Sequence, residues 1–154
     1  CSGQKLQVEK IVRLVSGHSI VALKEASGSL DQASEIRHHT PSDFGIYSGD
    51  DSLTLPLLAV GGRGVVSVAS HLVGNRLQQM VEAFERGQPQ VATQIHIELF
   101  PLFKALFLST NPIPVKTALM LQGWQVGGFR LPLVDLSPDH VAKLKSVMAE
   151  LSLL

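Results

Sequence analysis

The sequence predicts an α/β fold in which a small parallel sheet with helical crossovers is followed by a helical cap. Up to residue 69, short apolar runs alternate with segments of helical spacing. This alternation is typical of βαβ units, whose strands are buried and whose crossovers are helical. Beyond Val73 the strand pattern disappears and helical periodicity continues to residue 151. The expected layout is therefore three strand-and-helix units and a cap made only of helices.

Hydrophobic periodicity sets the limits of each expected element. Val8, Ile11, Val12 and Val15 recur at helical spacing, whereas the strands are short runs rich in β-branched residues. The expected strands span residues 19–23, 44–48 and 64–69. The expected helices span residues 7–15, 29–38, 52–60, 73–86, 89–108, 115–122 and 138–151. Glycine and proline predict breaks at residue 87, at residues 111–114 and at residues 127–128.

The amino-acid composition limits the classes of molecule that this protein is expected to bind. The chain has 154 residues, 13 basic and 13 acidic side chains and a single cysteine, which excludes a disulfide within the chain. No block of like charge points to nucleic acid or to an acidic membrane, and no signal peptide or apolar segment of membrane-spanning length is visible. We therefore expect a cytoplasmic protein with small neutral or anionic ligands. Because the sequence begins at Cys1 and not at methionine, we expect a fragment or a processed chain.

Lys24 is the candidate nucleophile. It closes an apolar run that begins at residue 19, so we expect it at the carboxyl end of a buried strand. Burial in an apolar wall would favour the neutral amine, which can form a Schiff base with a carbonyl compound. The alternative, which the local pattern by itself favours, is a lysine whose stem lies on apolar surface while its ammonium reaches water.

Four segments in order along the chain resemble the dihydrodipicolinate synthase family. They are residues 24–28 (Lys-Glu-Ala-Ser-Gly), 47–51 (Tyr-Ser-Gly-Asp-Asp), 61–68 (Gly-Gly-Arg-Gly-Val-Val-Ser-Val) and 111–116 (Asn-Pro-Ile-Pro-Val-Lys). The resemblance implies the carboxyl-terminal half of a (β/α)8 TIM barrel, with strands six to eight, followed by a C-terminal helical domain. Residues 1–86 would form the partial barrel and residues 87–154 the helical domain. Barrel strands one to five are not in this sequence.

The same resemblance implies a Schiff-base lyase of lysine (diaminopimelate) biosynthesis. Lys24 would condense with pyruvate, and the resulting enamine would attack aspartate semialdehyde to give 4-hydroxy-tetrahydrodipicolinate. Gly49 and Val66 match positions that line the pyruvate pocket. No cofactor is expected. The expected partners are further copies of the chain, since the family forms homotetramers, or a complementing N-terminal half.

Two departures from the family weaken the expected activity of this chain by itself. The family's proton relay uses two threonines and a tyrosine from strands that this sequence does not contain. In addition, Cys1 stands where the family has an arginine that binds a substrate carboxylate, and cysteine has no planar cationic fork. We therefore expect poor turnover without the other half. The alternatives are a pyruvate aldolase acting on a sugar acid, similar to N-acetylneuraminate lyase, and a non-catalytic fragment.

Other motifs are better explained by structure than by chemistry. The Asp50–Asp51 pair is expected to cap a helix and not to bind a metal. The glycine-rich residues 61–64 precede a strand, so they predict a tight turn and not a phosphate loop. The histidines have no ligand-spaced partners, so no metal site is expected. The three phenylalanines at helical spacing are expected in a helix core or a subunit contact, and they are Phe100, Phe103 and Phe107.

The three expected strands predict an incomplete sheet. The strands that carry Lys24 and Val66 would be open edges, which a closed barrel does not have. Their inner faces would also lose the opposite half of their packing, so we expect the chain to self-associate, to bind a complementing N-terminal half or to be partly disordered around the strands. The residues expected on these inner faces are Ile20, Val21, Ile46, Val65 and Val66.

Overall fold

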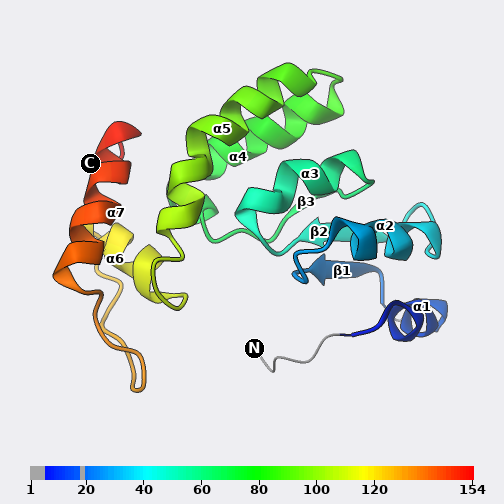
Figure 1. Cartoon of the computed structure of the whole chain (residues 1–154), viewed down its shortest axis with the longest axis horizontal. Helices are drawn as coiled ribbons and strands as arrows, with labels where there is room; N and C mark the ends of the chain where they lie inside the picture. The colour runs from blue at the N-terminus through cyan, green and yellow to red at the C-terminus, as the bar shows by residue number, and fades with distance from the viewer. Residues whose placement is uncertain (1–5, 18–19) are drawn as a thin grey trace. The chain divides into compact units, whose positions relative to one another are not determined.

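The computed structural model describes residues 6–17 and 20–154, and the chain divides into two compact units. The first unit is Cys1–Ser67 and the second is Val68–Leu154. The first combines a sheet with helices and the second is helical (Figure 1). The predicted α/β class and the small parallel sheet are confirmed. The finer division into a partial barrel up to residue 86 and a helical domain after it stays a prediction.

The first unit contains a three-stranded parallel sheet in the order β1-β2-β3. Its strands are β1 (Ala22–Glu25), β2 (Gly45–Ser48) and β3 (Gly64–Val65). Its helices are α1 (Val8–Ser16), α2 (Leu30–His38), a 3₁₀ turn η1 (Asp51–Leu53) and α3 (Thr54–Ala59). In register, Lys24 of β1 pairs with Tyr47 of β2, and Tyr47 pairs with Gly64 of β3. β1 and β3 are therefore the edge strands, as predicted.

The core of this unit lies between the helices and one face of the sheet. It is formed by Val8, Ile11, Ala33, Ile36, Phe44, Ile46 and Leu57. Ile46 is only 1% exposed and Leu23, its register partner, packs against the same core. The prediction that Ile46 and Val65 lie on the uncovered inner face is wrong, because side chains alternate along a strand and Gly45 and Tyr47 take that face instead. Val65 pairs in register with Ser48, which is on the same side of the sheet as Ile46.

Two strand limits also differ from the prediction. The first strand begins at Ala22 and continues through Lys24 to Glu25, because its ladder partner β2 begins only at Gly45. Residue 19, where this strand was expected to begin, lies outside the described residues. The third strand ends at Val65 and the chain then turns into helix α4, which begins at Ser70 and not at Val73. Non-helical dihedral angles at Val73 kink this helix, which explains why the periodicity places its start there.

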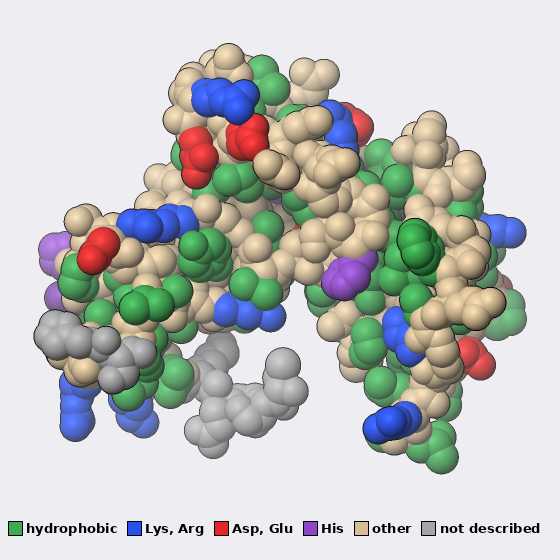
Figure 2. Space-filling view, turned by 180° about the vertical axis from the view of Figure 1, so that it is seen from behind, with side chains coloured by type: hydrophobic (Ala, Val, Ile, Leu, Met, Phe, Trp, Pro, Cys, Tyr) green, Lys and Arg blue, Asp and Glu red, His purple; other side chains and the backbone are tan. Residues whose placement is uncertain are grey.

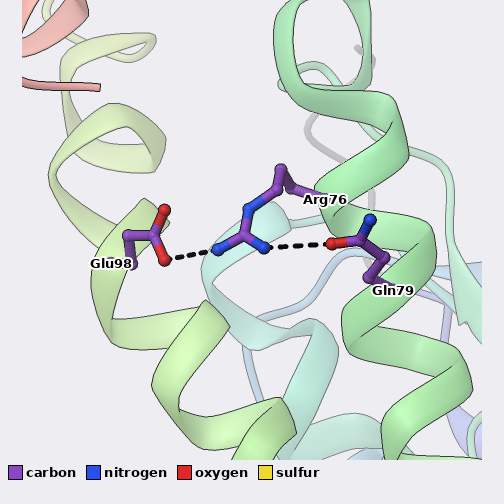
Figure 3. Close-up of polar contacts among 3 residues, drawn as sticks. All are labelled: Arg76, Gln79 and Glu98. Carbon is purple, nitrogen blue, oxygen red and sulfur yellow. Dashed lines mark hydrogen bonds and ion pairs between the residues drawn. The ribbon is translucent and has the colours of Figure 1, made fainter. Parts of the chain in front are cut away.

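The second unit is built from helices α4 (Ser70–Glu85), α5 (Pro89–Ala105), α6 (Ile113–Leu121) and α7 (Pro138–Glu150). The break at Gly87 is confirmed, with a φ of +72° that favours glycine, and α4 and α5 form a helical hairpin around it. Arg76 of α4 donates to Glu98 of α5 and to Gln79 of its own helix (Figure 3). This ion pair is exposed, so it contributes only about 0.2–1 kcal/mol to stability.

The predicted break between α5 and α6 is confirmed, but it spans residues 106–112, since α5 ends at Ala105 and α6 already begins at Ile113. After α6, an irregular connection runs to α7, and Lys116 holds it by donating to the Gly128 carbonyl oxygen at 2.6 Å. The Lys116 ammonium also lies 4.9 Å from the centroid of the Phe129 ring, a cation–π contact. The break expected at residues 127–128 thus falls in this connection.

The three phenylalanines of the segment 100–107 divide between core and surface. Phe103 is buried in the helical core, whereas Phe100 and Phe107 are exposed. The core role is confirmed for Phe103, and a subunit contact through the other two stays a prediction.

Surface properties agree with the composition. Within the described ranges 6–17 and 20–154, no helix has the length and apolar character needed to cross a membrane. On the face drawn in Figure 2, lysine and arginine side chains are scattered among apolar and polar ones and do not gather into one basic patch.

Candidate active site

The uncovered face of the sheet carries the candidate site. Counting in register from Lys24 and Tyr47, every second residue points away from the helical core. Most of these residues are glycine or alanine, so the face is nearly flat around a few longer side chains. They are Ala22, Lys24, Gly45, Tyr47, Gly49, Gly64 and Val66.

Lys24 lies inside β1, one residue before its carboxyl end, and its side chain extends toward that end. A Cβ atom built on Gly49 would lie 2.9 Å from the Lys24 Cε atom, so the lysine stem occupies space that only glycine leaves free. The expectation of a buried strand is wrong for this unit, since Ala22 and Lys24 are exposed and Leu23 is half-buried. The reason is that β1 is an edge strand and that no described residue covers this face of it. Lys24 is therefore still the candidate nucleophile because of its position on the strand, and not because it is buried.

Gly49 lies at the carboxyl end of β2 and is held there by backbone hydrogen bonds. Its N–H donates to the Glu25 carbonyl oxygen at 2.6 Å, which continues the β1–β2 ladder beyond both strands. A side chain at Gly49 would also meet the Ala26 Cβ atom at 2.7 Å. The backbone of β2 can therefore approach a small molecule bound to Lys24 closely.

Asp50 and Asp51 have structural roles at the same edge. Asp50 caps η1, because its Oδ1 atom accepts from the Ser52 N–H at 3.0 Å, which confirms the predicted cap. Asp51 is 1% exposed and accepts a hydrogen bond from the Ser67 hydroxyl group, which ties the loop after β2 to the chain after β3. In the described part of the chain, no three His, Cys, Asp or Glu side chains come together in a way that could hold a metal ion.

Val66 follows β3 and presents an apolar side chain at the third strand end. Its N–H donates to the Ser48 carbonyl oxygen at 2.8 Å, so the β2–β3 ladder also continues past the strands. Val66 is 49% exposed, which leaves its methyl groups open on the uncovered face. The structure thus brings Lys24, Gly49 and Val66 to the carboxyl ends of three neighbouring strands.

The glycine-rich residues before β3 form a tight turn, as predicted. The Gly62 N–H donates to the Leu57 carbonyl oxygen at 2.8 Å, and Gly61 has a φ of +95°. The turn starts β3 beside β2, because the Arg63 N–H donates to the Ile46 carbonyl oxygen at 2.8 Å. The turn therefore positions a strand.

The sequence analysis missed two polar contacts at this edge. The Ser67–Asp51 pair joins residues 16 positions apart, and Glu25 is buried while it accepts from the Ser27 N–H at 2.9 Å. Only the short-range second contact has a local signal, since a carboxylate two residues before a serine can form an Asx-like turn. Cys1, expected at the position of the family's arginine, lies outside the described residues.

Comparison with known proteins places the chain in a family. Residues 1–151 match the dihydrodipicolinate synthetase family. The chain is 63% identical over 153 residues to a 4-hydroxy-tetrahydrodipicolinate synthase of Synechocystis, covering 99% of this chain and 51% of that protein. It is 61% identical over 153 residues to the protein of the same name from Nostoc punctiforme, covering 99% of this chain and 52% of the relative.

Solved structures agree with the sequence comparison. The dihydrodipicolinate synthase of Cyanidioschyzon merolae, solved with lysine bound, matches with a TM-score of 0.97 and 49% identity, covering 99% of this chain and 52% of that chain. The enzyme of Acinetobacter baumannii, solved in complex with pyruvate, matches with a TM-score of 0.92 and 27% identity, covering 97% and 52%.

The chain spans about half the length of the curated relatives it matches. Within that span the agreement is continuous, since the matches cover 99% of the chain and include both of its compact units. This chain therefore belongs to the dihydrodipicolinate synthetase family.

Proposed function

We propose that the chain is the carboxyl-terminal half of a 4-hydroxy-tetrahydrodipicolinate synthase and that Lys24 is its Schiff-base lysine. The observation that carries this proposal is the place of Lys24 at the carboxyl edge of the sheet, with its stem in the space left by Gly49. Chemistry in (β/α)8 barrels takes place at the carboxyl ends of the strands. The names of the 61–63% identical relatives support the same activity.

The reaction would proceed through covalent catalysis. The neutral Lys24 amine attacks the keto carbon of pyruvate, and loss of water gives an iminium ion. This ion accepts electrons, so a proton leaves the pyruvate methyl group and an enamine forms. The enamine carbon attacks the aldehyde carbon of aspartate semialdehyde. The amino group of the new chain then attacks the iminium carbon, which closes the ring and releases Lys24.

Gly49 and Val66 would form the pyruvate pocket. Gly49 brings the β2 backbone within reach of the bound carbonyl compound, because any side chain there would displace the Lys24 stem. Val66 offers exposed methyl groups at the next strand end, which suit the methyl group of pyruvate. Both positions depend on the hydrogen bonds that extend the ladders past β1 and β2.

The remaining parts of the proposal concern the whole protein. β1, β2 and β3 would be strands six to eight of a (β/α)8 barrel, with residues 1–86 in the partial barrel and residues 87–154 in the helical domain. The open edges at β1 and β3 support this reading, because barrel closure would pair both of them. The other half would supply the proton relay, and the complete cytoplasmic enzyme would act as a homo-oligomer on pyruvate and aspartate semialdehyde.

Trapping with borohydride tests the proposed nucleophile. The chain is incubated with pyruvate and sodium borohydride, alone and together with the matching N-terminal half of the Synechocystis relative, and the adduct is mapped by mass spectrometry. We expect a pyruvyl adduct on Lys24 that increases when the other half is present, and none after Lys24→Ala. The exposed Lys104 is the internal control. An adduct on Lys104 or Lys116 that survives Lys24→Ala would contradict the assignment.

A product assay with the completed enzyme separates the alternatives. Condensation with aspartate semialdehyde supports the synthase, whereas turnover of sugar acids in its place would identify a pyruvate aldolase. An adduct on Lys24 without turnover of either substrate would leave the chain as a non-catalytic fragment that retains its lysine.

A further inference from the structure

Tyr47 is the one aromatic side chain beside Lys24 on the uncovered face of the sheet. The two residues are register partners on neighbouring parallel strands, and neighbouring strands lie about 4.8 Å apart. Tyr47 is half-buried although the face around it is uncovered. The sequence contains no second tyrosine, and the proposed chemistry gives this one no role.

Two glycines make room for the Tyr47 ring. A Cβ atom on Gly45 would lie 2.9 Å from the Tyr47 Cε2 atom, and one on Gly64 would lie 3.4 Å from its Cδ1 atom. Gly45 precedes Tyr47 by two residues on the same strand face, so the ring leans toward the amino end of β2. Gly64 is its register partner on β3, so the ring also lies across the sheet, away from β1.

The side chains of Lys24 and Tyr47 therefore start from adjacent positions and point in different directions. The lysine extends to the carboxyl end, where its Cε atom reaches the space over Gly49, and the tyrosine extends to the amino end over Gly45. Every other residue on this face of β1 and β2 is alanine or glycine, so no other side chain of these strands could fill the space below the lysine. The Tyr47 ring fills the amino side of this face on β2 and β3, over Gly45 and Gly64.

We propose that Tyr47 is a positioning residue whose ring, over Gly45 and Gly64, blocks the amino side of the face next to Lys24 and so keeps the amine directed to the carboxyl edge. This inference rests on the proposed function, because it concerns the direction from which a keto acid reaches the amine. The ring, and not the phenol hydroxyl group, carries the effect, since the ring leans away from the lysine amine. Misplacement of a reacting group by about 1 Å can lower a rate by up to about 100-fold, so orientation alone gives a measurable effect.

The test uses the 154-residue chain and three variants at one position. Tyr47→Phe keeps the ring, Tyr47→Leu keeps an apolar side chain of smaller size, and Tyr47→Ala removes both. The first readout needs no substrate: a nuclear Overhauser effect between the Lys24 ε-protons and the Gly49 α-protons. The second is the rate of borohydride trapping of pyruvate on Lys24, relative to Lys104. Amide chemical shifts of Ile46 and Leu57 report whether the core of the unit stays intact.

We expect the wild type and Tyr47→Phe to show the Overhauser effect and equal trapping rates. Tyr47→Leu and Tyr47→Ala should lose the effect and trap pyruvate about tenfold more slowly. If Tyr47→Ala changes the amide chemical shifts of the core, the result for Tyr47→Leu decides the test. An Overhauser effect that persists in Tyr47→Leu, or a trapping rate that drops as far in Tyr47→Phe, would overturn the inference.

The two proposals fail in different ways. If the wild type forms no Lys24 adduct even with the complementing half, the proposed function falls, while the Overhauser effect still decides whether Tyr47 positions the lysine. If Lys24 forms the adduct at the same rate in all variants, the proposed function stands and the positioning role of Tyr47 falls.

Discussion

The two compact units differ in how they bury their apolar surface. In the first unit, helices cover one face of the sheet, while the other face and the edges expose Val66, at 49%, and Val21, at 78%. In the second unit, four helices bury Leu99, Leu102 and Phe103 among themselves. A sheet has two faces and needs two covering layers, whereas a helix needs only one covered stripe. The comparison shows that the helical unit can complete a core from its own residues and that the sheet unit cannot.

Phe103→Ala tests the helical core and has the largest expected effect. Phe103 is 2% exposed, and truncation of a buried phenylalanine lowers the free energy of unfolding by about 3–5 kcal/mol. Phe107→Ala, just past the end of α5 and 49% exposed, is the control and should change it by less than about 0.5 kcal/mol. Urea unfolding followed by circular dichroism measures both. Equal losses in the two variants would mean that α5 is not packed as described.

Hydrogen exchange compares the two units directly. We expect the amides of β1 and β3 to exchange about 100-fold faster than those of the buried face of α5, because edge strands open locally at low free energy. A factor of 100 corresponds to about 2.7 kcal/mol in opening free energy. Adding the matching N-terminal half of a relative should slow the strand amides and leave α5 unchanged. Strong protection of all three strands in a monomeric chain would contradict the incompleteness of the first unit.

The sequence predicted those features that depend on neighbours along the chain. The α2, β2 and α5 segments, the cap at Asp50 and the breaks at Gly87 and between α5 and α6 follow from periodicity and from glycine and proline chemistry. The strand limits did not, since β1 spans the residues that pair with β2, Ala22 to Glu25, and not the apolar run. Ile46 was assigned to the wrong face because an unbroken apolar run does not show which residues point to which side.

In the candidate site too, features that depend on neighbours along the chain could be predicted, and features that depend on other segments could not. The position of Lys24 near the carboxyl end of its strand could be predicted, because the run that contains it is local. Its exposure could not, because exposure depends on what covers the sheet from outside this chain. The hydrogen bond between Ser67 and Asp51 and the contact of the Tyr47 ring with Gly64 join segments that are far apart in the sequence, and no spacing in the sequence marks them.

Gly49→Ala tests the contact between β1 and β2 at the site. The new Cβ atom would meet the Ala26 Cβ at 2.7 Å and the Lys24 Cε at 2.9 Å, so the lysine stem must move. We expect trapping of pyruvate on Lys24 to slow by about tenfold, equivalent to about 1.4 kcal/mol. Gly128→Ala in the helical unit is the control, because nothing lies within 4 Å of its new Cβ atom. Equal trapping rates in the two variants would show that Gly49 does not constrain Lys24.

The smallest expected effect concerns His96 on α5 and the stability of the helical unit as the pH changes. The His96 ring lies 6.0 Å from the ring of Phe103, and its Nδ1 atom is buried with no hydrogen-bond partner among the described residues. Burial disfavours the charged imidazolium and lowers the pKa of His96 below its usual value of 6.5. The unfolded chain therefore binds a proton more readily than the folded one as the pH falls below 6.5. The free energy of unfolding of the helical unit should therefore fall as the pH decreases from 6.5 to the lowered pKa of His96. Above pH 6.5, His96 should not change this free energy.

Thermal unfolding at pH 7.5 and pH 5.5 measures this dependence. His96→Gln, which cannot take up a proton, should unfold at more similar temperatures at the two pH values than the wild type does. His71→Gln on α4, where the histidine is exposed, is the control and should keep the wild-type difference. A pH dependence that survives in His96→Gln would mean that other titratable groups cause it, such as His140 of the same unit or the histidines at positions 38 and 39 of the first unit.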